Sequence, residues 1–205
     1  MIADDLPTSH SNMHTHIQRH SMKTGEKKPG SVMEGFIAGK VLESNHAAWQ
    51  AGNLFGAELP LTTMQAISAR QLKKATIWKL TDYITEDQIS LGVGILGMPG
   101  STAYGGTVDV LRPKEGETIF VSAACGAVGS MVGQIAKNVY KCTVIGSCGD
   151  PNKCDLIKKK FGFDHAIDYK QCKSKDDLLA ALKTAAPDGI DMYWEVCHCV
   201  SYSYN

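Results

Sequence analysis

The sequence predicts an α/β protein whose second half forms a parallel β-sheet covered by helices. Two observations carry this prediction. From Glu117 onward, short apolar runs alternate with helical segments, which is the pattern of βαβ units. Between residues 30 and 80 the hydrophobic pattern is broken and β-like, without a long helical period. We therefore expect a small β region followed by a larger α/β region.

Residues 1–30 are predicted to form a flexible tail. This segment is polar, rich in Ser, His, Lys and Thr, and shows neither helical nor strand periodicity. His14, His16 and His20 raise the alternative of a metal site. Three histidines without a folded scaffold to orient them make a poor specific site, so the solvated tail is favoured.

The β-like region contains two strand candidates. Residues 36–42 are expected to form a strand or a strand pair, and residues 75–80 another strand. Residues 52–60 are assigned to turns because they contain glycine and proline. The sequence thus predicts a small, incomplete β domain over residues 31–92.

A short helix and a glycine-rich junction are expected next. Thr85 and Gln88 have capping-box spacing, which predicts a helix start. The next helix is expected around Thr102. Between them, Pro99 and several glycines predict a flexible junction: Gly92, Gly94, Gly97 and Gly100.

The second half, residues 93–205, alternates regularly between strands and helices. Asp150 followed by Pro151 predicts a helix start, since Asp is a good N-cap and Pro suits the first helical position. Ser174 is expected to cap another helix. A first helix is expected over residues 130–139. Four strands are expected, at residues 118–121, 142–146, 166–169 and 190–196.

The turn between the first of these strands and its helix is the most informative segment. It reads Ala123-Ala124-Cys125-Gly126-Ala127-Val128-Gly129. Gly126 allows a backbone to approach a pyrophosphate, and Gly129 allows the helix to pack close to the sheet. The amides at the helix start would then face the phosphates. Ala124 replaces the first glycine of the usual pattern. The strand–turn–helix context favours a dinucleotide site over a turn that only packs.

The end of the second strand favours NADP over NAD. NAD sites usually carry an acid there to bind the ribose 2′-hydroxyl. Here the strand ends without one, and Asp150 is expected to be occupied as an N-cap. Lys153 could contact a 2′-phosphate, a charge-assisted contact worth roughly 1.5–3 kcal/mol. Tyr169 could add a hydroxyl donor. The alternative for Lys153 is a solvated helix lysine.

Composition disfavours several other classes. Lys+Arg 21 and Asp+Glu 21 balance, unlike the basic excess of a general nucleic-acid binder. No apolar run approaches the length of a membrane span, and the start lacks the apolar core of a signal peptide.

The chain contains 7 cysteines, an odd number, and none of them lies before Cys125. Free thiols in a reducing cytoplasm are therefore favoured over a disulfide framework or a zinc lobe.

Several segments together closely resemble the zinc-independent medium-chain dehydrogenase/reductases. The resemblance is strong from about Gly92 to Tyr193, weak from Gly30 to Leu91 and absent before that. The branch that looks nearest contains prostaglandin reductases, leukotriene hydroxydehydrogenases and plant NADPH-dependent double-bond reductases. The matching segments are residues 94–104, residues 123–137, Phe161-Gly162-Phe163-Asp164 and Asp168-Tyr169-Lys170.

This resemblance implies a Rossmann-type parallel sheet, partial here, with a partial GroES-like β domain N-terminal to it. It implies NADP as cofactor and reduction of the C=C bond of α,β-unsaturated ketones or aldehydes by hydride transfer without a metal. Residues 126–129 would hold the pyrophosphate, Lys153 and Tyr169 the 2′-phosphate, and Met98 and Thr102 would line the cleft near the nicotinamide. No catalytic residue is identified. The implied cofactor-binding residues are Met98, Thr102, Ala124, Gly126, Ala127, Val128, Gly129, Lys153 and Tyr169.

The end of the chain departs from the family pattern. Members carry Asn-Val-Gly-Gly after the fourth strand, where this chain has Val196-Cys197-His198-Cys199. Members also continue well beyond Asn205, so an incomplete member is expected. The fourth strand would then leave an unpaired edge, which is compatible with a homodimer. The Cys-His-Cys run could bind a metal, but adjacent ligands are sterically awkward.

Three functions follow from these features. The first is an enone or enal reductase that acts on a small-molecule substrate, with no role for nucleic acid or a membrane. The second is a truncated, non-catalytic NADP-binding fragment or pseudoenzyme. The third is a quinone reductase of the same superfamily.

Overall fold

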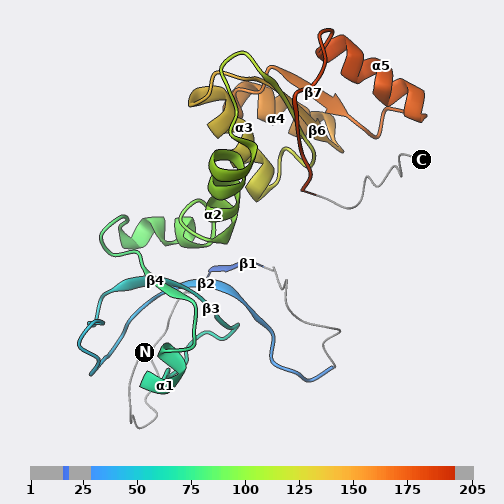
Figure 1. Cartoon of the computed structure of the whole chain (residues 1–205). Coiled ribbons are helices and arrows are strands. Elements are labelled where there is room, and N and C mark those ends of the chain that lie inside the picture. The colour runs from blue at the N-terminus through green and yellow to red at the C-terminus, as the bar shows by residue number, and fades with distance from the viewer. Residues whose placement is uncertain (1–15, 19–28, 197–205) are drawn as a thin grey trace. The chain divides into compact units, whose positions relative to one another are not determined.

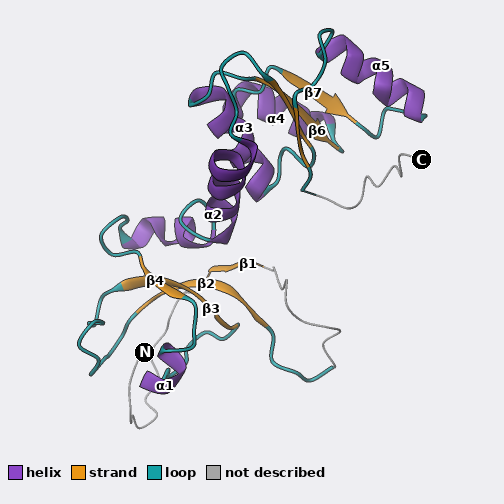
Figure 2. Ribbon diagram, viewed as in Figure 1, coloured by secondary structure: helices purple, strands orange, loops and turns teal. Residues whose placement is uncertain are grey.

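The computed structural model describes residues 16–18 and 29–196 of the chain (Figure 1). The chain forms two compact units, residues 1–98 and residues 99–205. The sequence placed the boundary earlier, between residues 92 and 93. The predicted α/β class is confirmed, because the second unit contains a parallel sheet with helices between its strands (Figure 2).

The first unit is built on a four-stranded antiparallel sheet in the order β1-β2-β3-β4. Ile37 and Ala57 face each other across β2 and β3 and are buried with Phe55 in the main apolar cluster. A four-residue helix, α1 (Ala69–Leu72), follows β3. The strands are β1 (His16–Gln18), β2 (Glu34–Lys40), β3 (Leu54–Pro60) and β4 (Ile77–Lys79).

The turn predicted over residues 52–60 is wrong, because strand β3 occupies most of that segment. Gly56 lies in the middle of β3 beneath the indole of Trp78, and a Cβ there would overlap the ring. The glycine therefore serves close packing between β3 and β4, which a glycine-rich turn pattern does not distinguish from a reversal of the chain.

Most of the expected N-terminal tail, including His14 and His20, lies outside the described residues. Within residues 1–30, the short strand β1 pairs antiparallel with β2, with Ile17 opposite Ile37. The polar pattern of this segment did not indicate a strand. Pairing with an existing strand supplies backbone hydrogen bonds that local sequence does not reveal.

The segment predicted as a flexible junction is instead mostly helical. A 3₁₀ helix, η1 (Glu86–Val93), begins after the expected cap, where the Thr85 amide donates to Gln88 Oε1 at 3.4 Å. Helix α2 (Met98–Gly105) contains Pro99 and continues into the π-helical turn η2 (Gly106–Leu111). A Cβ at Gly97 would lie 2.5 Å from the Gly92 carbonyl oxygen, so the glycines here allow close backbone approach.

The second unit contains a parallel sheet in the order β7-β6-β5-β8. All four predicted strands are confirmed, and Asp150 and Ser174 cap their helices as predicted. The first helix begins at Ala127, earlier than the expected residue 130, because Gly126 itself serves as N-cap. The elements are β5 (Thr118–Val121), α3 (Ala127–Asn138), β6 (Thr143–Cys148), α4 (Pro151–Phe161), β7 (His165–Asp168), α5 (Lys175–Ala185) and β8 (Met192–Trp194).

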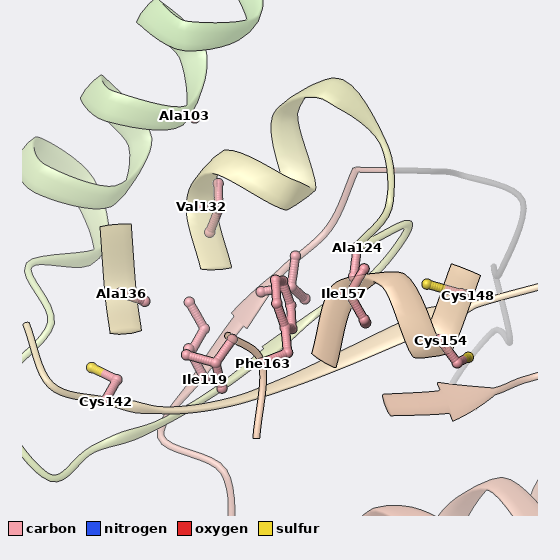
Figure 3. Close-up of a cluster of buried hydrophobic side chains, with 12 residues drawn as sticks. Ala103, Ile119, Ala124, Val132, Ala136, Cys142, Cys148, Cys154, Ile157 and Phe163 are labelled. Atoms are coloured by element: carbon pink, nitrogen blue, oxygen red, sulfur yellow. The ribbon is translucent and has the colours of Figure 1, made fainter. Parts of the chain in front are cut away.

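The two faces of this sheet pack against different helices. On one face, Ile119 and Val144 are buried with Val132 of α3 and Ile157 of α4 (Figure 3). On the other face, Ile145 and Ile167 pack with residues of α5. Alternating side chains along parallel strands produce this division, and it leaves the carboxyl ends of the strands free to carry a site.

The strand β8 pairs only with β5 among the described residues, with Val121 opposite Trp194. No helix within residues 16–18 and 29–196 has the length and apolar character needed to cross a bilayer.

Candidate functional site

The turn from β5 to α3 is anchored to both neighbouring strands. The Ser122 amide donates to Trp194 O of β8, and the Ala124 amide donates to Ser147 O of β6, each at 3.0 Å. Between them, Ala123 has φ +44°, a left-handed conformation that costs a non-glycine residue roughly 1–3 kcal/mol. The anchors on either side hold this conformation in place.

The start of helix α3 offers unoccupied amides. Gly126 is the N-cap, with φ −75° and ψ 170°, and no side chain caps the helix. Gly126 and Ala127 are exposed, and Val128 is half-buried. The first amides of a helix have no acceptor within it and carry its partial positive charge. The amides of residues 127–129 can therefore bind an anion such as a phosphate.

Gly129 is needed for the close approach of α3 to the turn. A Cβ there would lie 2.7 Å from the Ala123 carbonyl oxygen, and Gly129 is buried. One turn later, a Cβ at Gly133 would overlap the ring of Phe163. Gly129 therefore has the packing role predicted from the sequence, and Gly133 allows α3 to pack against Phe163.

Ala124 does not face a ligand. Its side chain is 0% exposed, and its amide is already bonded to Ser147 O. A Cβ placed on Gly146 of β6 would lie 2.6 Å from Ala124 Cβ, so the alanine fits because Gly146 leaves the space. The position of Ala124 supports a packing role and gives no support to the predicted cofactor contact.

The end of β6 places Asp150, Lys153 and Tyr169 as follows. Asp150 Oδ1 accepts the amides of Asn152 at 2.8 Å and Lys153 at 3.3 Å, so this carboxylate caps α4. Lys153 is exposed in the first turn of the helix. Tyr169, directly after β7, donates its amide to Cys148 O at 3.0 Å. Its hydroxyl lies over Gly149, because a Cβ on that glycine would be 2.6 Å from it.

Met98 and Thr102 lie on α2, half-buried and exposed respectively. Met98 is the last residue of the first unit, and Thr102 belongs to the second. Their contact with a nicotinamide remains a prediction. The Cys197-His198-Cys199 run, where the sequence departs from the family pattern, lies outside the described residues.

Sequence reasoning missed two hydrogen bonds that the buried hydroxyl of Ser122 makes at the carboxyl ends of β5 and β8. Ser122 is 2% exposed; its hydroxyl donates to Glu195 Oε1 at 2.8 Å and accepts the Val196 amide at 2.9 Å. The Tyr193 hydroxyl donates to the other oxygen of Glu195. A serine directly after an apolar strand was the available signal, but its partners lie more than 70 residues further along the chain.

Three cysteines meet beside the turn. Cys148 and Cys154 of α4 are both buried in the same apolar cluster (Figure 3), and Cys125 packs against that cluster. Burial, reinforced by the neighbouring thiols Cys154 and Cys125, raises the pKa of the Cys148 thiol to about 12. Burial also raises the pKa of Cys154. Both thiols are therefore protonated at neutral pH and suited to packing rather than to nucleophilic chemistry.

A cavity of about 630 Å³ lies elsewhere in the second unit, between α4, β7 and α5. Its lining includes Lys158, His165, Asp168 and Cys172, and the glycine-rich turn contributes nothing to it. The candidate phosphate site is thus an exposed helix start rather than this cavity. Within residues 16–18 and 29–196, no three His, Cys, Asp or Glu side chains are grouped to hold a metal.

Comparison with known proteins agrees with this fold. Residues 127–202 match a family model described as zinc-binding dehydrogenase. A 2-alkenal reductase (NADP(+)-dependent) of Nicotiana tabacum is 47% identical over 82% of this chain and 46% of its own length. Prostaglandin reductase 1 of Oryctolagus cuniculus is 41% identical over 85% of this chain and 48% of its own.

A solved structure, CurA from Vibrio vulnificus in complex with NADPH, has 36% identity and a TM-score of 0.65, covering 85% of this chain and 49% of that one. The chain spans about half the length of the curated relatives that it matches. The parallel sheet, the glycine-rich turn and these similarities together place the chain in the medium-chain dehydrogenase/reductase family.

Proposed function

We propose that this chain takes part in NADPH-dependent reduction of the C=C bond of α,β-unsaturated ketones and aldehydes. The observation that carries the proposal is the uncapped, exposed start of α3, joined to β5 by a turn of small residues. The relatives named 2-alkenal reductase, pulegone reductase and prostaglandin reductase support the substrate class.

The residues present fit NADP. The amides of residues 127–129 would hold the pyrophosphate, and the uncapped helix start with its exposed Gly126 supports this. Lys153, in the first turn of α4, and Tyr169, whose hydroxyl lies over Gly149, would hold the 2′-phosphate. Asp150 does not compete as a ribose ligand, because its carboxylate caps α4. This arrangement favours the phosphorylated dinucleotide over NAD.

When bound, NADPH would supply a hydride to the β-carbon of the substrate. The C=C electron pair then moves toward the carbonyl oxygen, and the α-carbon takes a proton from solvent or a donor. The proposal requires no metal, since hydrogen-bond donors can stabilise the charge on that oxygen. The chain's own contribution, on the residues described, is to bind and orient the dinucleotide.

A second candidate function is nucleotide binding without turnover. The turn, Lys153 and Tyr169, which would hold the phosphates, all belong to the second unit. The free cysteines of the described residues are consistent with a reducing compartment, and we include the cytoplasm in the proposal. A small-molecule substrate is the expected partner.

The test uses the full 205-residue chain. NADPH is titrated while intrinsic fluorescence is followed, and a 2-alkenal, pulegone or a quinone is then added while NADPH absorbance is recorded. Consumption with the alkenal or pulegone supports the proposed reaction, and consumption only with a quinone assigns a quinone reductase. Binding without consumption supports the second function. Absence of NADPH binding overturns both.

A further inference from the structure

Two side chains lie over Gly149, at the loop between β6 and α4. A Cβ on Gly149 would lie 2.6 Å from Tyr169 Oη and 2.8 Å from Tyr169 Cζ. It would also lie 3.1 Å from Cε of Lys170, the carbon that carries the ammonium group. The missing Cβ of Gly149 therefore gives room to both residues, and Lys170 belongs to the same small region as Tyr169.

The turn after β7 explains how consecutive residues reach one loop. Asp168 Oδ1 accepts the Lys170 amide at 3.1 Å, and Asp168 O accepts the Gln171 amide at 3.0 Å. The Tyr169 amide is bonded to Cys148 O across the strands. In an extended strand, neighbouring side chains point to opposite faces, whereas this turn brings both back over Gly149.

The charge on Lys170 is available to a ligand. The side chain is exposed, and none of the ion pairs formed by the described residues includes it. Asp150 Oδ1 accepts the amides of Asn152 and Lys153, and Asp168 Oδ1 accepts the Lys170 amide. Asp168 Oδ2 is buried and has no hydrogen-bond partner among the described residues. Neither carboxylate forms an ion pair with the Lys170 ammonium group, so that group can still contact a phosphate.

We propose that Lys170 is a further specificity-determining residue, whose ammonium group contacts the 2′-phosphate of NADP together with Lys153 and Tyr169. This inference rests on the proposed function, since it needs the dinucleotide to bind at the α3 start. A charge-assisted contact of this kind corresponds to about 10-fold to 100-fold in affinity. The contact exists only with the phosphorylated dinucleotide, so it acts on the preference for NADPH over NADH.

The test compares Lys170→Ala, Lys170→Arg and a control, Lys160→Ala. Lys160 is exposed near the opposite end of α4 from Lys153. Affinities for NADPH and NADH are measured by fluorescence titration, and circular dichroism monitors folding. We expect Lys170→Ala to weaken NADPH binding about 10-fold without changing NADH binding. We expect Lys170→Arg to retain most of the preference, and Lys160→Ala to leave it unchanged.

Two outcomes overturn the inference while the proposed function stands: Lys170→Ala leaves the NADPH preference intact, or it weakens both dinucleotides equally. Equal affinities of the unchanged chain for NADPH and NADH also overturn it. If the unchanged chain binds neither dinucleotide, the proposed function itself fails, and that result is visible before any variant is made. Gly149→Ala offers an independent check, because the added Cβ must displace Tyr169 and Lys170 and should lower the same preference.

Discussion

The indole of Trp194 on β8 lies flush against the backbone of Gly106, so that a Cβ on Gly106 would overlap the ring. Gly106 begins the π-helical turn η2, and Trp194 ends the strand that pairs with β5. This contact joins the helical segment before β5 to the far edge of the parallel sheet. A glycine is therefore required at position 106 for packing rather than for backbone freedom.

The variant Gly106→Ala should destabilise the second unit by about 1–3 kcal/mol, because an overpacked core forces neighbours to move. The matched control is Gly105→Ala, one residue earlier, where a Cβ would meet only Asp109 Oδ2 at 3.8 Å. Alanine there should be neutral or stabilising by up to about 1 kcal/mol. Urea unfolding measures both variants, and equal stabilities would contradict the packing assigned to Trp194.

The complementary sizes of Ala124 and Gly146 predict that a second substitution at position 124 restores part of the stability lost by a substitution at position 146. Gly146→Ala should destabilise the chain, since its Cβ would lie 2.6 Å from Ala124 Cβ and 2.6 Å from Ile157 Cδ1. Adding Ala124→Gly removes one of these clashes, so the double variant should be more stable than Gly146→Ala alone. A double-mutant cycle in urea gives the coupling, expected at about 0.5–3 kcal/mol for residues in contact. Additive effects would show that the two positions do not compete for space.

We expect the hydroxyl of Ser122 to contribute measurably to the free energy of unfolding. Ser122→Ala removes the donor to Glu195 and the acceptor of the Val196 amide. Both partners belong to exposed residues, so water can replace part of these bonds, and we expect a loss of about 0.5–1.5 kcal/mol. Thr184→Ala is the control, because the Thr184 hydroxyl makes one exposed bond to Ala180 O on α5. If both variants lose equally little stability in urea, the end of β8 does not depend on Ser122.

The sequence predicted those features whose physical cause is local. The Asp150 cap needs only the next three residues, and the strands of the parallel sheet follow from continuous apolar runs. The prediction failed at β3, where the role of Gly56 is decided by Trp78, on the neighbouring strand. It likewise missed Lys170, because the relation to Gly149 exists only once β6 and β7 are paired.

Burial of the Cys148 thiol predicts a loss of stability at high pH. Its pKa rises from the ordinary 9.0 to about 12 in the folded chain, first because of burial. As pH rises above 9, the unfolded chain releases this proton before the folded chain does, so unfolding becomes more favourable. The contribution is fully present below pH 9 and is lost progressively toward pH 12. The urea midpoint should therefore fall as the pH is raised from 8 to 10. Cys148→Ala should make this fall smaller than it is in Cys172→Ala, the control with a less buried thiol. An equal fall in both variants would contradict the role given to Cys148.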